Sequence, residues 1–203
     1  MMIHKVETRR KQIAFTFDDG PDPVYTPQLA ALFREYGGSA TFFVIGRQLE
    51  QHRELAKALH DEGHELGNHT FSHPALPRLD EVQRREELER ADALIESIAG
   101  AKPFSFRAPF LHSDEAVDEL VRERGYVSAG GTNLDSRDWA MPGAEHIVDT
   151  IRPVLRPGSV ILLHDGGGDR SQTVEAVRRL LPEVVALGLE PVTFAELVRG
   201  SRE

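Results

Sequence analysis

The segment Gln12–Pro21, QIAFTFDDGP, joins an apolar run to two adjacent aspartates and a Gly-Pro pair. The run Gln12–Phe17 predicts a buried strand, and the Asp, Gly and Pro residues after it predict the turn that ends this strand. The stretch Thr26–Tyr36 then predicts a helix. A strand followed by a polar turn and a helix is the repeating unit of an α/β fold with a parallel sheet.

The same alternation of short apolar runs and longer amphipathic stretches continues to the end of the chain. Leu49 and Leu59 are predicted to share one helical segment, Asp80 and Gly100 are predicted to bound a second, and Ser113 to begin a third. About seven strand–helix units predict a parallel sheet, and closing it into a barrel would cover both of its edges. The further predicted strands are Ala40–Val44, Glu65–Asn68, Phe104–Arg107, Tyr126–Ala129, Ser159–Leu163 and Leu189–Val192.

Composition narrows the class of protein. A chain of 203 residues favours one domain spanning residues 1–203. The sequence has no cysteine, which excludes disulfide frameworks, thiolate zinc sites and cysteine nucleophiles. The 24 Lys and Arg residues against 33 Asp and Glu residues give a net charge of −9, which argues against nucleic-acid binding and against docking on an anionic membrane. A neutral or cationic substrate suits this charge better.

The sequence shows no membrane-spanning stretch, because no segment approaches the roughly 18 consecutive apolar residues of a span. The N-terminal residues MMIHKVETRRKQ are basic, but no apolar segment follows them, so we expect no signal peptide. Two interpretations of localisation stay open: a cytoplasmic protein, or a domain from which a leader or an anchor has been trimmed. The sequence predicts no oligomeric state.

The side chains capable of chemistry follow the predicted strands. In parallel sheets and barrels the active site lies at the carboxyl ends of the strands, so we expect these groups to meet at one edge. They are Asp18 and Asp19 after the first strand, His69 after the third, Arg107 at the end of the fourth, Asp135–Trp139 after the fifth, and His164 with Asp165 at the end of the sixth.

The segment HTFSH, His69–His73, places two histidines four residues apart, so that one helical turn would let both imidazoles reach a single ion. Taken singly, such a pair is often a surface feature, and Asp-Gly-Pro is ordinary turn chemistry. Together, two histidines and one aspartate form the three-ligand set of a catalytic metal site. Ferrous oxygenases share this set, but we would expect an all-β pattern for them.

Five motifs occur in order: TFDDGP (Thr16–Pro21), HTFSH (His69–His73), RAPF (Arg107–Phe110), DSRDW (Asp135–Trp139) and LLHD (Leu162–Asp165). They resemble the motifs of the polysaccharide deacetylases, the NodB-homology family of metal-dependent carbohydrate esterases (family 4). The resemblance implies a single-domain distorted (β/α)7 barrel that removes acetyl groups from N-acetylated sugars.

The resemblance covers residues 12–197 and implies a metal site. Asp19, His69 and His73 are the implied ligands. Zinc is our first choice for this mixed donor set, and the resemblance also admits cobalt or another divalent ion.

The resemblance also implies a base and an acid. Asp18 would accept a proton from the attacking water, and Arg107 would keep its carboxylate ionised. His164 would protonate the leaving amine, and Asp138 would raise the pKa of His164 by stabilising the imidazolium.

Three further positions are implied for the substrate. The backbone N–H of Phe110 would stabilise the oxyanion, and Leu163 would form part of the pocket for the acetyl methyl group. Trp139 has two interpretations, a flat face for the sugar ring or a core aromatic. The chain departs from the family pattern at Phe110-Leu111, where Tyr-Gly is usual, so a phenolic hydroxyl is missing.

The preferred function is therefore N-deacetylation of polymers that contain N-acetylglucosamine, such as chitin or peptidoglycan. One alternative is an O-deacetylase of the acetylxylan esterase type. A second is an inactive carbohydrate-binding protein, against which the complete set of acidic and histidine residues argues. The sequence leaves the polymer and its acetylation pattern open.

Overall fold

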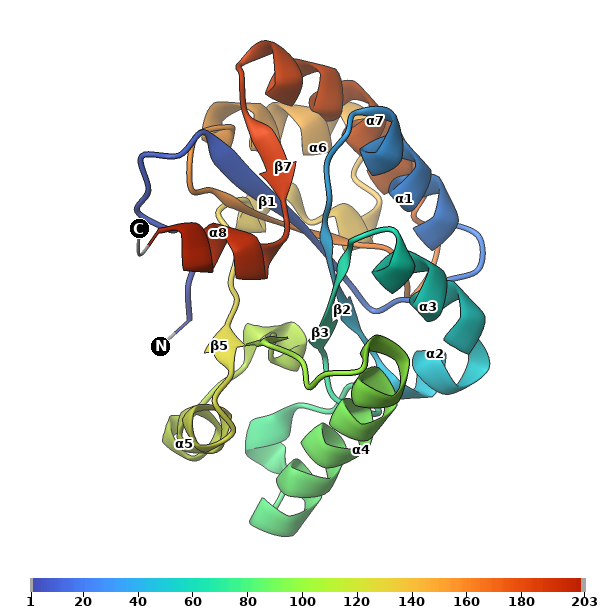
Figure 1. Ribbon diagram of the computed structural model, residues 1–203, viewed down its shortest axis with the longest axis vertical. Helices are drawn as coiled ribbons and strands as arrows, with labels where there is room; N and C mark the ends of the chain where they lie inside the picture. The colour runs from blue at the N-terminus through green and yellow to red at the C-terminus, as the bar shows by residue number, and fades with distance from the viewer. Residues whose placement is uncertain (1, 202–203) are drawn as a thin grey trace.

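The computed structural model describes residues 2–201, in which seven parallel strands form one curled sheet with helices packed around it (Figure 1). The strand order is β5-β4-β3-β2-β1-β6, and β7 also pairs with β1. This arrangement confirms the distorted barrel expected from the alternation of strands and helices. The strands are β1 Gln12–Asp18, β2 Thr41–Val44, β3 Glu65–Asn68, β4 Ser105–Phe106, β5 Val127–Ser128, β6 Val160–His164 and β7 Glu190–Val192.

Helix α4 (Glu81–Ala99) begins and ends at the residues that the sequence predicts. Asp80 accepts a hydrogen bond from the N–H of Gln83 in a capping box, and Gly100 ends the same helix with φ 72°. The α-helices are α1 Thr26–Glu35, α2 Gly46–Gln51, α3 Arg53–Asp61, α4 Glu81–Ala99, α5 Glu115–Glu123, α6 Ala144–Ile151, α7 Ser171–Ala186 and α8 Phe194–Gly200.

Two local predictions are wrong. Helix α5 is capped by Asp114, whose Oδ1 accepts from the N–H of Val117, and not by Ser113. Both residue types are good caps, so the pattern could not choose between neighbours. The helical segment predicted around Leu49 is divided into α2 and α3 at His52, whose φ and ψ are −128° and 42°.

The two edges of the sheet, β5 and β6, are not paired with each other in the described chain. The N-terminal segment lies between them, where Ile3 bridges to Ala129 and Lys5 bridges to Ser159. The barrel is thus completed by a short segment and not by a full ladder.

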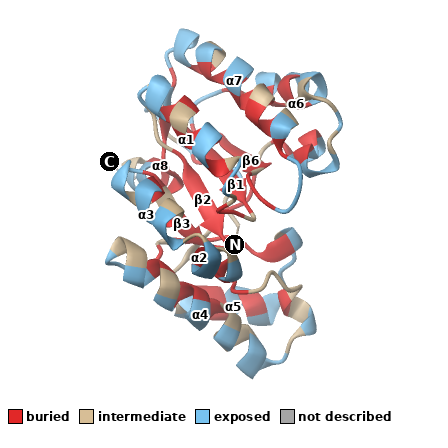
Figure 2. Ribbon diagram, turned by 90° about the vertical axis from the view of Figure 1, so that its right-hand side faces the viewer, coloured by how far each residue is buried: buried red, intermediate tan, exposed pale blue. Residues whose placement is uncertain are grey.

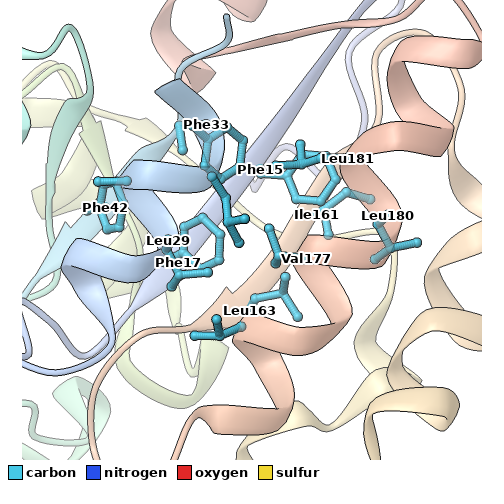
Figure 3. Close-up of a cluster of buried hydrophobic side chains, with 14 of the residues drawn as sticks. Phe15, Phe17, Leu29, Phe33, Phe42, Ile161, Leu163, Val177, Leu180 and Leu181 are labelled. Atoms are coloured by element: carbon cyan, nitrogen blue, oxygen red, sulfur yellow. The ribbon is translucent and has the colours of Figure 1, made fainter. Parts of the chain in front are cut away.

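The core lies between β1, β6 and the helices α1 and α7 (Figure 3). Phe15 and Phe17 of β1 point into it, and the Phe17 ring stacks on Phe42 with 5.3 Å between centroids. Burying each such aromatic ring contributes roughly 1.5–3 kcal/mol. Figure 2 shows the buried residues gathered on the strands and on the inner faces of the helices.

The strand register brings chemically capable residues to one end of the barrel. Asp18 lies beside His164 in the β1–β6 pair, and Asn68 lies beside Phe106 in the β3–β4 pair. The residues that follow these strands therefore open onto a common space. Among residues 2–201, no helix has both the length and the apolar character needed to cross a bilayer.

Candidate metal centre and active site

Asp19, His69 and His73 each offer a ligand atom, and these atoms lie within 4.8 Å of one another. The Nε2 atoms of His69 and His73 face Oδ1 of Asp19 at 3.5 and 3.3 Å. That oxygen is buried and has no hydrogen-bond partner among the described residues. A buried carboxylate oxygen facing two imidazole nitrogens is a donor set that a divalent cation fits.

The two histidines do not lie on a helical turn, contrary to the sequence prediction. They belong to a bend after β3, in which Thr70 and His73 adopt φ values of 67° and 61°. Such left-handed conformations cost roughly 1–3 kcal/mol for residues other than glycine. Asp19 also lies in this region, with φ 75°. The ligands therefore converge through strained loop backbone, which helical spacing does not anticipate.

The protonation states of the ligands suit metal binding. Nδ1 of His69 donates to the carbonyl of Arg107 at 2.8 Å, which leaves the lone pair on Nε2. Burial and the neighbouring His69 lower the pKa of His73, which favours the neutral ring. Burial alone would raise the pKa of Asp19, but the hydrogen bond and charge of a protonated His69, with smaller effects of protonated His164 and His73, lower it to about 2 in the metal-free site.

Asp18 and Arg107 form a buried ion pair beside the ligands. Nη1 of Arg107 donates to Oδ1 of Asp18 at 2.7 Å, and the two residues are 0% and 4% exposed. The guanidinium also donates to the carbonyls of Ala129 and Gly130, at 3.2 and 2.6 Å, and lies over the Phe43 ring at 4.3 Å. These contacts fix its position, so Asp18 faces a permanent positive charge.

Asp138 and His164 form a second pair. Nδ1 of His164 donates to Oδ1 of Asp138 at 2.8 Å, while Oδ2 accepts from the His164 N–H and the Thr173 hydroxyl, each at 2.8 Å. Burial lowers the pKa of His164, but the hydrogen bond and charge of Asp138, together with the charges of Asp18 and Asp19, raise it above its ordinary value. Because Nδ1 is bound to Asp138, Nε2 of His164 is the ring nitrogen that can exchange a proton with a group in the cavity.

One cavity of about 640 Å³ is lined by Asp18, by the Asp138–His164 pair and by the three candidate ligands. Phe110 and Trp139 lie on its rim with 59% and 56% exposure, so Trp139 is not a core aromatic. The edge of the Phe110 ring approaches His73 at 4.7 Å between centroids. Phe110 and Leu111 have φ values of 61° and 55°, in the region that a glycine would occupy without strain.

Leu163 was expected to form part of the pocket for the acetyl methyl group, and the structure places its side chain away from the cavity. Leu163 is fully buried in the core, as Figure 3 shows, and Leu162 lines the cavity instead. Side chains alternate along a strand, so Leu162 shares its face with His164. This alternation could have identified Leu162 from the sequence. Leu134 and Arg170 also line the cavity, and no pattern in the sequence singled them out.

Asp165 lies beneath the turn that carries the ligand carboxylate. Its Oδ2 accepts from the Thr26 hydroxyl at 2.5 Å, and its N–H donates to the carbonyl of Asp18 at 3.0 Å. Burial, together with the negative charges of Asp19 and Asp18, raises the pKa of Asp165 to about 7. This residue supports the turn and does not line the cavity.

Known proteins resemble this chain in sequence. A family model described as polysaccharide deacetylase matches residues 5–129. The chain is 40% identical to a peptidoglycan-N-acetylglucosamine deacetylase of Bacillus cereus, over 96% of this chain and 92% of the relative. It is 36% identical to a chitooligosaccharide deacetylase of a Bradyrhizobium species, over 89% and 87% of the two chains.

A solved structure shows the same fold. It is a peptidoglycan N-acetylglucosamine deacetylase bound to an N-hydroxybenzamide, 28% identical, with a TM-score of 0.92 over 100% of this chain and 94% of that one. The family resemblance seen in the five motifs is thereby confirmed.

Proposed function

Because the chain belongs to the polysaccharide deacetylase family, we propose that its cavity hydrolyses the N-acetyl groups of N-acetylglucosamine-containing glycans. One observation supports this above the others. The three candidate ligands, a carboxylate held by arginine and an imidazole held by aspartate all line the same cavity. Amide hydrolysis needs an activated water, a base and an acid, and each has a candidate here.

The proposed cofactor is zinc, held by Asp19, His69 and His73. Two imidazole nitrogens and one carboxylate oxygen are a common protein ligand set of catalytic zinc, and cobalt or another divalent ion suits the same donors. A divalent cation bound there acidifies water and polarises the acetyl carbonyl.

Asp18 is the proposed general base, which takes a proton from the attacking water. Its carboxylate must be ionised to do so, and it lies in a buried ion pair with the Arg107 guanidinium. The 2.7 Å contact occupies only Oδ1 of Asp18, and Oδ2 lies 4.0 Å from Nε2 of His69. The oxygen nearer the ligands is therefore the one proposed to accept the proton.

His164 is the proposed general acid, which delivers a proton from Nε2 to the departing amine. Asp138 binds Nδ1 and so orients the ring and favours its protonated form. The N–H of Phe110 is the proposed donor to the developing oxyanion, and Trp139 offers its ring to a sugar face. Leu162 takes the place first expected for Leu163 beside the acetyl group.

The relatives named above act on peptidoglycan and on chitooligosaccharides, so these two glycans are the proposed substrate classes. The rival function is O-deacetylation. An ester needs less protonation of its leaving group than an amide does, so the acid distinguishes the two.

The test is acetate release from chitin oligomers, peptidoglycan and acetylxylan, each with and without EDTA. We expect chelator-sensitive release from an N-acetylated glycan. His164→Ala should then remove amide hydrolysis while sparing much of the activity on an activated ester. Sugar binding without acetate release in added zinc or cobalt would instead support an inactive binding protein, and equal losses on both substrates would reject His164 as the acid.

A further inference from the structure

Helix α4 contacts the loop that carries two of the candidate ligands, although the residues lining the cavity come from other described elements. The centre of this contact is Glu87. Its Oε2 accepts from the N–H groups of Phe71 and Ser72 at 3.0 and 2.7 Å, and its Oε1 accepts from the Ser72 hydroxyl at 2.6 Å. Both carboxylate oxygens are thus bound to the residues between the two imidazoles.

The remaining N–H groups of the loop donate to one residue at the end of β3 and one residue of the loop itself. The N–H of Thr70 donates to Oδ1 of Asn68 at 2.7 Å, and the N–H of His73 donates to the Thr70 hydroxyl at 3.0 Å. Every backbone N–H from residue 70 to residue 73 therefore donates to a side chain. Glu87 accepts the two N–H groups in the middle of the loop, and it is the one of these acceptors that lies on helix α4.

Other groups of α4 bind the same loop. The Asn68 amide donates to the carbonyl of Leu88 at 3.1 Å and to Oδ1 of Asp92 at 2.7 Å. The Arg90 guanidinium lies over the Phe71 ring at 3.4 Å from its centroid. Residues 87–92, which span less than two turns of a regular helix, thus present a rigid surface to a loop whose backbone is left-handed at two positions.

We propose that Glu87 is a positioning residue for the metal centre: its bonds to Phe71 and Ser72 hold His69 and His73 at the spacing needed to share one cation. Strained backbone persists only where its surroundings fix it, and Glu87 supplies that fixation from outside the loop. Partners beyond the ligands typically alter metal affinity by about 10- to 100-fold. The inference rests on the proposed metal centre.

The experiment measures zinc dissociation constants of the full chain by competition with a chromophoric chelator. Glu87→Ala should weaken zinc binding about 10- to 100-fold. Glu87→Gln should recover most of the loss, because its amide oxygen can still accept from both backbone N–H groups. Glu86→Ala, on the exposed side of the same helix, is the matched control and should bind zinc as the unaltered chain does.

Further readouts separate positioning from general stability. The melting temperature of each metal-free variant shows whether the fold survives, and saturating zinc should restore kcat of Glu87→Ala with KM unchanged. Ser72→Ala, which removes only the hydroxyl contact, should weaken zinc binding by less than Glu87→Ala does. Unchanged zinc affinity in Glu87→Ala would overturn the inference. Failure of the unaltered chain to bind any divalent ion would instead overturn the proposed metal centre.

Discussion

Two buried aspartates of the cavity differ in the cation that each one binds. Asp18 contacts the guanidinium of Arg107 at 2.7 Å, and Asp138 contacts the imidazole of His164 at 2.8 Å. The aspartates are 4% and 1% exposed, so both carboxylates are buried. The two contact distances and the burial of the two aspartates are nearly the same, but the partners differ in whether they exchange a proton near neutral pH.

A guanidinium keeps its proton well above neutral pH, whereas an imidazole exchanges one near neutrality. Arg107 therefore takes no part in proton transfer, and within this pair only Asp18 can accept a proton. Asp138 instead stabilises a charge that His164 gains and loses. An aspartate thus serves as the proposed base in one pair and supports the proposed acid in the other. The difference comes from its partner, which is Arg107 after β4 in one pair and His164 at the end of β6 in the other.

The strongest test of this contrast is Asp18→Asn. The amide keeps the shape of the carboxylate but cannot accept the proton, so we expect the rate of acetate release to fall on the order of a thousandfold. Steady-state kinetics on a chitin oligomer with saturating zinc measures the loss. Near-normal turnover would show that the base lies elsewhere.

A smaller effect is expected for Asp138→Asn, and it takes the form of a shift in pH dependence. Burial lowers the pKa of His164 and Asp138 raises it, so removing the carboxylate charge lowers the pKa. A general acid acts only when protonated, so the fall in kcat at high pH should begin about one pH unit lower. Asp135→Asn, exposed in the same loop, is the control. If the pH dependence of kcat in Asp138→Asn equals that of the control, Asp138 does not raise the pKa of His164 as proposed.

The smallest effect concerns Asp165, a buried carboxyl with no cationic partner among the described residues. Its pKa in the folded chain is about 7 against an ordinary value of 3.8, so the folded state favours the protonated form. Raising the pH from 5 to 8 ionises it and destabilises the fold. Asp165→Asn mimics the protonated form and removes this penalty.

The melting temperature of Asp165→Asn, measured with EDTA, should therefore exceed that of the unaltered chain by more at pH 8 than at pH 5. We expect the gain at pH 8 to be about 5 °C. The exposed Asp61→Asn serves as the control. A pH-independent difference would contradict the assigned ionisation.

The parts of the site that lie on strands could be predicted from the sequence. Apolar runs identified β1 and β6, and parallel pairing brings their carboxyl ends together, so Asp18 and His164 could be expected to meet. The family resemblance implies Leu163 at the pocket, whereas the alternation of side chains along a strand favours Leu162, on the same face as His164. Leu162 lines the cavity, as this alternation predicts.

The parts that lie on loops could not be predicted in the same way. The spacing of His69 and His73 indicated a shared ion, but it suggested a helical turn where the chain forms a bend with left-handed residues. The contact from Glu87 joins residues that are 15 and 16 positions apart in sequence, and no periodic pattern announces it. Such contacts depend on tertiary packing, which local sequence does not encode.

Metal content tests the account most directly, because every proposed role in the cavity depends on Asp19, His69 and His73 sharing one cation. Elemental analysis of zinc-loaded protein after gel filtration should find one equivalent per chain in the unaltered protein and in Asp18→Asn. Asp19→Ala should retain almost none. Equal zinc in all three proteins, or none in the unaltered chain, would contradict the account.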